Sequence, residues 1–227
     1  GEAGIGKSTL AAHFARYVAD TGGAIRAFTC RPELRLSPLA PLAGMFEARC
    51  GIGPDDPPAT RRQKLRDFLQ RDWSDRADEA FPLLTDLLDP DADAIHNKEG
   101  LFRLILGMFA SLGKRSPLLL VLEDAHWADA ATLEFLDRLK LTDLPIMTLT
   151  VSREEGSLFE SVPHAARITL GPLADTSALA LLQSLPATAA VPAEQLNELA
   201  RRAGGIPLYL RELAALAGEL EGGGDLA

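Results

Sequence analysis

A chain of 227 residues, of which 47% are hydrophobic, is long enough to bury one α/β core with a small helical appendage, or to form two modest domains. Lys and Arg total 23 against 32 Asp and Glu, so the formal charge is −9 and direct nucleic-acid binding by this segment is not expected. No apolar run approaches the ~20 residues of a membrane-spanning helix, so no membrane contact is expected. Cys30 and Cys50 have neither disulfide-framework nor zinc-site spacing, which favours a reducing, cytoplasmic compartment.

The first nine residues carry the pattern on which the functional interpretation depends. They read Gly1-Glu2-Ala3-Gly4-Ile5-Gly6-Lys7-Ser8-Thr9, a match to the phosphate-binding pattern G-x-x-x-x-G-K-[ST]. Glycines allow consecutive backbone N–H groups to turn toward a phosphate chain, and Lys7 adds a mobile positive charge. The Ser8 hydroxyl is a ligand for Mg²⁺ at the outer phosphates, beside the positive end of the helix that starts here. The alternative is a glycine-rich turn before an ordinary helix.

A loop of this kind normally follows a buried strand, but Gly1 is the first residue. We therefore expect the chain to be a fragment whose first strand is missing. After the loop, apolar residues at helical spacing predict a helix from Ser8 to about Val18, which Gly22-Gly23 ends. Ala24–Thr29 is predicted to be a short strand.

A helical excursion is expected to occupy residues 36 to 113, approximately. Four apolar repeats predict its helices: Leu39/Leu42/Phe46, Leu65/Phe68/Leu69, Phe81/Leu84/Leu87/Leu88 and Leu101/Leu104/Ile105/Met108/Leu112. The polar, proline-rich segment Gly51–Pro58 separates the first two.

An unbroken apolar run, Leu118–Leu122, ends in Glu123-Asp124. Such a run is typical of a central parallel strand that is buried on both faces. The acidic pair then lies at the carboxyl end of the strand, where ligands of open α/β sheets bind. Asp129 is predicted to cap the following helix, whose inward-facing residues are Leu133, Leu136 and Leu139.

Two further strands are predicted after this helix. Pro145–Val151 reads as a buried strand closed by Ser152-Arg153, and Ala166–Leu170 reads as a weaker strand. Gly171-Pro172 marks a boundary, beyond which the apolar spacing is helical throughout.

Hydrolysis of a bound nucleotide needs a metal-holding acid, a group that orients water, and positive charge on the transferred phosphoryl group. Of Glu123 and Asp124, one is expected to hold Mg²⁺ and the other to orient or deprotonate the water, and the sequence leaves open which does which. Arg153 is a candidate to contact the γ-phosphate; the alternative is a solvated arginine paired with Glu154 or Glu155. Pro207, in Gly205-Ile206-Pro207, reads locally as an ordinary helix start.

With these features assembled, the sequence resembles the STAND class of P-loop ATPases, close to the AAA+ division. Within that class it is similar to the ATPase modules of bacterial regulators that carry adenylate/guanylate cyclase or LuxR-type DNA-binding domains. The resemblance rests on the loop Gly1–Thr9 (Walker A), on Leu119-Leu120-Val121-Leu122-Glu123-Asp124-Ala125-His126-Trp127-Ala128-Asp129 (Walker B), on Ser152-Arg153, on Leu170-Gly171-Pro172-Leu173 and on Gly204-Gly205-Ile206-Pro207-Leu208.

The resemblance implies an α/β fold with the parallel sheet of P-loop NTPases, flanked by helices and followed by a helical lid. The expected domains are a nucleotide-binding domain at 1–171, which contains the excursion, a lid at 172–221, and a linker or cut end at 222–227. In that family the Gly-x-Pro element lies beside the adenine, so the resemblance implies that Pro207 contacts the adenine base. The family more often has Asp where this chain has Glu123.

The function that this resemblance implies is an ATP-binding and slowly hydrolysing, Mg²⁺-dependent regulatory switch. Its partners would be ATP and ADP, an effector domain in cis, and other copies of the protein in a nucleotide-dependent oligomer. The alternatives are a scaffold that holds ATP with little or no hydrolysis, and a P-loop phosphotransferase, for which the sequence has no acceptor-site motif. Nucleophile–histidine catalysis is not supported, because the chain lacks G-x-S-x-G.

Overall fold

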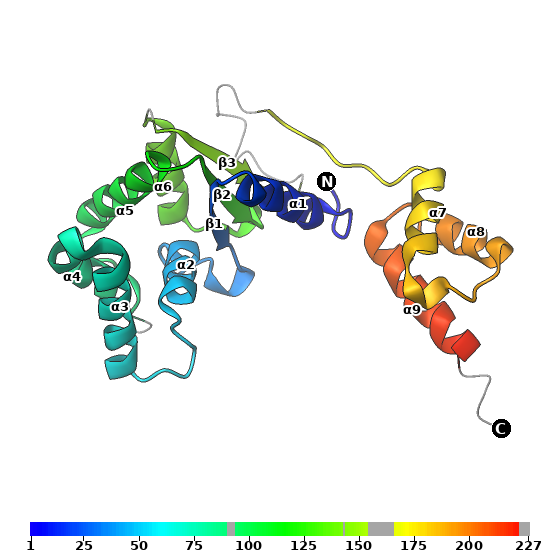
Figure 1. Cartoon of the computed structure of the whole chain (residues 1–227), viewed down its shortest axis with the longest axis horizontal. Helices are drawn as coiled ribbons and strands as arrows, with labels where there is room; N and C mark the ends of the chain where they lie inside the picture. Colours follow the sequence, from blue (N-terminus) through cyan, green and yellow to red (C-terminus); the bar gives the residue numbers. More distant parts are fainter. Residues whose placement is uncertain (90–93, 143, 154–165, 223–227) are drawn as a thin grey trace. The chain divides into compact units, whose positions relative to one another are not determined.

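The computed structural model describes residues 1–89, 94–142, 144–153 and 166–222. Contacts between residues divide the chain into two compact units (Figure 1). The larger unit is formed by Ala11–Ser152, and the smaller by Gly1–Leu10 together with Arg153–Ala227. Each unit has a hydrophobic core of its own.

Within the described residues, a parallel sheet of three strands forms the centre of the larger unit (Figure 1). β1 (Ala24–Thr29) pairs with β2 (Leu118–Glu123), and β2 pairs with β3 (Ile146–Thr150). In this register Thr29 lies opposite Glu123, and Leu122 lies opposite Thr150. The parallel sheet, flanked by helices, confirms the predicted α/β fold class.

The central position of β2 follows from its composition. Its apolar residues Leu118–Leu122 are all buried, as predicted. Because side chains alternate along a strand, Leu119 and Val121 share one face, where they pack with Ala11 of α1 (Lys7–Asp20). The three leucines at even positions point to the opposite face.

Helices of the excursion and the helix after β2 complete the larger unit. They are α2 (Ala40–Cys50), α3 (Pro58–Trp73), α4 (Ala77–Leu87), α5 (Lys98–Gly113) and α6 (Ala130–Lys140), with the 3-10 turns η1 (Pro32–Leu34), η2 (Ser74–Arg76) and η3 (Ala125–Trp127) between them. The first four α-helices confirm the four predicted repeats. Edge-to-face ring contacts run from Phe28 through Phe109 and Phe135 to Phe102, and so join β1, α5 and α6 in one core.

Three details of the prediction for the later strands and helices are wrong. β3 is not a buried strand, because within the described residues it has a neighbour on one side only, and Met147 is 53% exposed. Residues 166–170 form no strand. In α6, Leu139 is buried as predicted, but Leu133 and Leu136 are half-buried and Phe135 is the fully buried residue.

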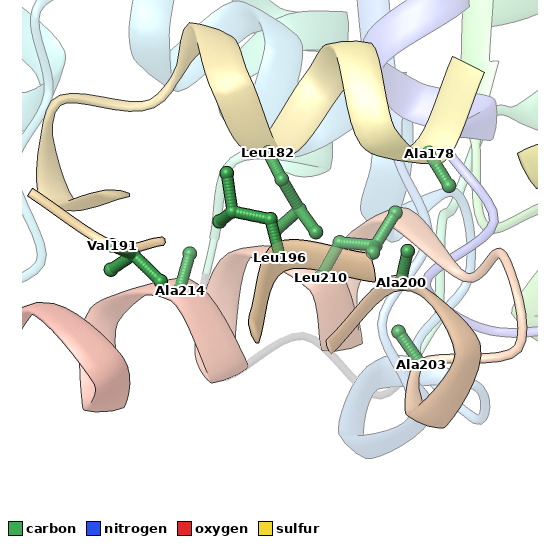
Figure 2. Packing of buried hydrophobic residues seen from close by; sticks show 8 residues of the cluster. All are labelled: Ala178, Leu182, Val191, Leu196, Ala200, Ala203, Leu210 and Ala214. Carbon is green, nitrogen blue, oxygen red and sulfur yellow. The ribbon is translucent and has the colours of Figure 1, made fainter. Parts of the chain in front are cut away.

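The core of the smaller unit lies between α7 (Asp175–Ser184), α8 (Ala193–Arg202) and α9 (Pro207–Gly222). Leu182, Leu196 and Leu210, one from each helix, meet at its centre and are at most 5% exposed (Figure 2). The helical prediction for this region is confirmed, including the start of α9 at Pro207. Residues 223–227 of the predicted linker lie outside the described residues.

Of the helices in the described ranges, none combines the length and the apolar character needed to cross a bilayer.

Asp129 connects two distant parts of the larger unit. Its buried carboxylate accepts hydrogen bonds from Thr132 N (2.9 Å), which confirms the predicted cap of α6, and from Leu39 N (3.0 Å) at the start of α2. Leu39 is fully buried and has a left-handed backbone with φ of 56°. The side chain of Asp129 therefore satisfies a backbone donor that water cannot reach.

We expect Asp129→Ala to lower the free energy of unfolding by about 2–4 kcal/mol, the sum of a lost helix cap and an unsatisfied buried N–H group. Asp129→Asn keeps an acceptor oxygen for both N–H groups, so its loss should be about 1 kcal/mol or less. Urea denaturation of the two variants measures this difference. If both variants lost the same free energy of unfolding, the hydrogen bonds from Leu39 and Thr132 would not be the source of the stabilisation by Asp129.

The thiol of Cys30 is expected to be unreactive in the folded chain. Burial, aided by the negative charges of Asp129 and Asp124, raises the pKa of Cys30 from 9.0 to about 12. A raised folded-state pKa stabilises the fold below pH ~9, and this contribution is lost as the pH rises toward 12. At about pH 8, iodoacetamide should modify Cys30 at least roughly a hundredfold more slowly in folded than in urea-unfolded protein, as mass spectrometry of timed samples would show.

Candidate functional site

The loop Gly1–Thr9 belongs to the smaller unit and has the backbone that a phosphate-binding loop requires. Gly4 and Gly6 have φ values of 75° and 100°, which residues with a Cβ rarely adopt. Ile5 between them is buried and anchors the loop. The loop leads directly into α1, since the N–H of Leu10 donates to Gly6 O at 2.9 Å. The loop therefore leads into the N-terminus of a 14-residue helix, and helix N-termini are sites at which anions bind.

Lys7 provides the positive charge of the loop. Its ammonium group donates hydrogen bonds to Gly1 O (2.8 Å) and Glu2 O (2.6 Å), so the side chain folds back over the loop. These two carbonyls hold the cation beside the glycines without neutralising it. Left-handed glycines, a helix N-terminus and an ammonium group together form a set of donors that fits a polyphosphate.

The start of α9 contacts this loop within the smaller unit. The N–H of Leu208 donates to Gly4 O at 3.2 Å, and a Cβ added to Gly4 would lie only 2.7 Å from Leu208 Cβ. The nearest described atom to a Cβ built on Gly6 is Pro207 Cγ, at 4.0 Å. Pro207 therefore lies next to the loop, although its contact to a base stays a prediction.

A second contact joins the segment before α7 to the same region. Leu173 N donates to Gly205 O at 2.8 Å, and a Cβ added to Gly1 would lie 2.7 Å from Leu170 O. Three motifs that are far apart in the sequence thus converge in one unit: the loop, residues 170–173 and residues 204–208. Periodicity did not predict the contact between Leu208 and Gly4, and the only sequence signal was the presence of both residues in the strings that carry the family resemblance.

We expect Gly205→Ala to disrupt this junction. Gly205 has φ of 73°, and a Cβ there would lie 2.4 Å from the backbone oxygen of Leu173. Steric overlap and left-handed strain together should cost about 2–4 kcal/mol. Gly204→Ala is the matched control, because Gly204 has φ of 57° but no neighbour within 4 Å, so strain alone should cost about 1 kcal/mol. Equal losses in denaturant unfolding would rule out the contact with Leu173 as the cause.

The acidic pair belongs to the larger unit. Glu123 is the last residue of β2, and its carbonyl accepts from Cys30 N at 3.0 Å. Asp124 has a left-handed backbone with φ of 51°, a conformation that is uncommon outside glycine but enriched in Asp and Asn. This bend allows Ala125 N to donate to Val151 O at 2.9 Å, which ties the turn to the end of β3. Asp124, one of the two acids predicted to hold Mg²⁺ or to act on water, therefore has a strained backbone, and such strain is often found at functional sites.

Carboxylates lie at this end of the sheet. Burial, followed by the negative charges of Asp129 and Asp124, raises the pKa of the Cys30 thiol, so both carboxylates act on the same region. Among the described residues, no three His, Cys, Asp or Glu side chains are grouped so that they could hold a metal by themselves. One or two carboxylates fit Mg²⁺ when a hydroxyl and phosphate oxygens supply the other ligands, as predicted for Ser8.

The predicted site residues are thus divided between the two units. The loop, Pro207 and the exposed Arg153 belong to the smaller unit, and Glu123 and Asp124 to the larger. The structure brings together the loop and Pro207, and separately Glu123, Asp124 and the end of β3. That the two groups bind one ligand stays a prediction. Glu154 and Glu155, the alternative partners of Arg153, lie outside the described residues.

Comparison with known proteins identifies the class of this chain. Residues 1–151 match the model of the AAA ATPase domain family, which is more than half of the chain. The chain belongs to this family, and membership implies nucleotide binding. An uncharacterized protein of Rhizobium meliloti (strain 1021) is 27% identical over 225 residues, which cover 94% of this chain and 22% of that protein. The chain therefore spans about a fifth of the length of this relative. No solved structure gives a significant match.

Proposed function

We propose that this chain binds ATP with Mg²⁺ and hydrolyses it slowly, as the regulatory switch of a larger signalling or transcription-regulating protein. The observation that carries the proposal is the loop itself, with left-handed Gly4 and Gly6 and the ammonium of Lys7 at the start of α1. The match to the AAA ATPase domain family supports it. The much greater length of the Rhizobium meliloti relative supports a role within a larger protein.

Each residue has a role in this proposal. The loop amides and Lys7 bind the phosphates, and Pro207 contacts the base. Ser8 and one carboxylate of the Glu123-Asp124 pair hold Mg²⁺, which supplies positive charge at the outer phosphates. The other carboxylate orients the attacking water, and Arg153 contacts the γ-phosphate.

A switch also requires that the loop and the lid respond to each other. We propose residues 172–221 as the lid, and the hydrogen bond from Leu208 to Gly4 as its connection to the loop. A side chain on Gly4 would overlap Leu208, so the two segments are in close contact. A change in the loop when phosphates bind would then change the packing of α9. An effector domain in cis and nucleotide-dependent association of copies belong to the same proposal.

Calorimetric titration with ATP and ADP, with and without Mg²⁺, tests the binding step, and release of inorganic phosphate tests hydrolysis. The switch predicts Mg²⁺-dependent affinity for both nucleotides and slow phosphate release. Binding without phosphate release above background would favour the scaffold alternative. Failure of the full-length protein to bind either nucleotide would refute the proposal.

A further inference from the structure

A cavity of about 340 Å³ lies in the larger unit among β1, α2, α3 and α5. Among the described residues, its charged lining consists of four arginines, Arg26, Arg49, Arg71 and Arg115, and one acidic residue, Asp72. None of the residues proposed to bind ATP lines it. Its volume is in the range of small-molecule sites.

The single carboxylate does not balance these charges. Asp72 accepts from Arg71 Nε at 3.0 Å and lies 3.3 Å from an Arg49 nitrogen, so two cations share one anion. The half-buried Arg26 donates to its neighbouring carbonyl, Ile25 O, at 2.6 Å and forms no ion pair within the described part of the chain. Burial, reinforced by the positive charge of Arg49, lowers the pKa of Arg26. The cavity is thus an unneutralised positive site in a chain of net charge −9.

Several guanidinium groups elsewhere in the described chain are paired with carboxylates. Arg138, for example, binds both Glu99 and Glu134, and Glu198 binds the adjacent Arg201 and Arg202 at the surface. Surface pairs of that kind stabilise little and imply no ligand. The cavity differs because its arginines come from β1, α2, α3 and the turn after α5, which are distant in the sequence, and together they surround a hollow.

The other part of the lining is aromatic and sulfur-containing. Phe68, Trp73 and Phe109 contribute rings, and Met45 and Met108 contribute thioethers. The guanidinium of Arg49 lies 5.5 Å from the centroid of the Phe68 ring, so charge and ring surface are adjacent. Such a lining suits a ligand that has an anionic group next to a flat apolar body.

We propose that this cavity binds a small organic anion with at least two negative charges and a flat apolar portion. The anionic group lies among Arg26, Arg49 and Arg115, and the apolar portion lies against Phe68 and Trp73. The site does not depend on the ATPase assignment, because it uses other residues and another ligand.

1-Naphthyl phosphate is a suitable probe, since it joins a dianion to an aromatic body. Calorimetry of the whole chain should show binding that weakens at high salt. Trp73 is one of only two tryptophans, so in a Trp127→Phe background its fluorescence should change with the same affinity. 2-Naphthol, which lacks the charge, should bind at least about tenfold more weakly.

Arg26→Gln and Arg115→Gln should each weaken binding of 1-naphthyl phosphate about tenfold. Arg62→Gln is the control, because Arg62 is an exposed arginine of α3 that does not line the cavity, and its affinity should match the unaltered chain. Asp72→Asn should tighten binding several-fold, since it removes the one repulsive charge and frees two guanidinium groups.

Several outcomes would overturn the proposal. They are the absence of binding, equal affinity in Arg115→Gln and Arg62→Gln, and weaker binding in Asp72→Asn, which would mean that Asp72 supports the ligand rather than repelling it. Full competition by ATP would assign the probe to the loop instead. Arg115 is exposed, so its variant decides the question even if Arg26→Gln fails to fold.

Discussion

Replacing Lys7 with alanine is expected to weaken ATP binding by about 10- to 100-fold, the value of a charge-assisted hydrogen bond to phosphate. Lys7 is the cationic side chain of the loop, and it is already held beside the glycines by Gly1 O and Glu2 O. Calorimetric titration with Mg²⁺ and ATP measures the effect. Unchanged affinity would contradict the assignment of the loop as the phosphate site.

Lys7→Arg separates the loss of charge from the loss of geometry. The guanidinium keeps the positive charge but is larger and planar, so it should restore only part of the affinity. Because Lys7 also bonds two loop carbonyls, the thermal unfolding midpoint of both variants must be compared with the unaltered chain. A weaker nucleotide affinity at an unchanged midpoint would attribute the effect to the ligand.

Asp124→Asn is expected to lower the rate of phosphate release by about 10²- to 10³-fold while ATP affinity changes less than about threefold. The amide removes the charge that activates water, yet asparagine adopts the left-handed backbone that this position requires, so the turn into η3 should be preserved. Single-turnover phosphate release, measured beside equilibrium binding, tests both parts.

Glu123→Gln is the comparison that assigns the two acids. If Glu123 holds the metal, its variant should bind ATP more weakly and with less dependence on Mg²⁺, whereas Asp124→Asn should not. The reverse pattern would exchange their roles. Phosphate release by Asp124→Asn at the unaltered rate would show that this carboxylate does not act on water.

Local sequence patterns predicted most of the individual elements of this fold. The unbroken run Leu118–Leu122 predicted a buried central strand, and apolar spacing predicted the helices of the excursion and of the smaller unit. Local patterns failed where burial or strand pairing depends on which segments lie next to each other in the fold. The apolar composition of β3 suggested burial, but its place in the strand order leaves Met147 half-exposed, and residues 166–170 have strand-like composition without strand pairing.

The candidate site was predictable to the extent that its chemistry lies in continuous strings. The loop and the Glu123-Asp124 pair could be named from spacing alone, but the packing of Leu208 on Gly4 depends on residues about two hundred positions apart. The arginine-lined cavity gave no signal, because Arg26, Arg49, Arg71 and Arg115 have no common spacing and become neighbours only after folding.

The bond between Asp129 and Leu39 has a mechanical consequence for the larger unit. It links the N-terminus of α2 to the N-terminus of α6 through residues that are 90 positions apart. A displacement of the turn between β2 and α6 would therefore either move α2 with it or break the hydrogen bond from Leu39 to Asp129. Met45 and Arg49 of α2 line the arginine-rich cavity. A movement that begins beside the acidic pair would therefore be transmitted to that cavity by α2.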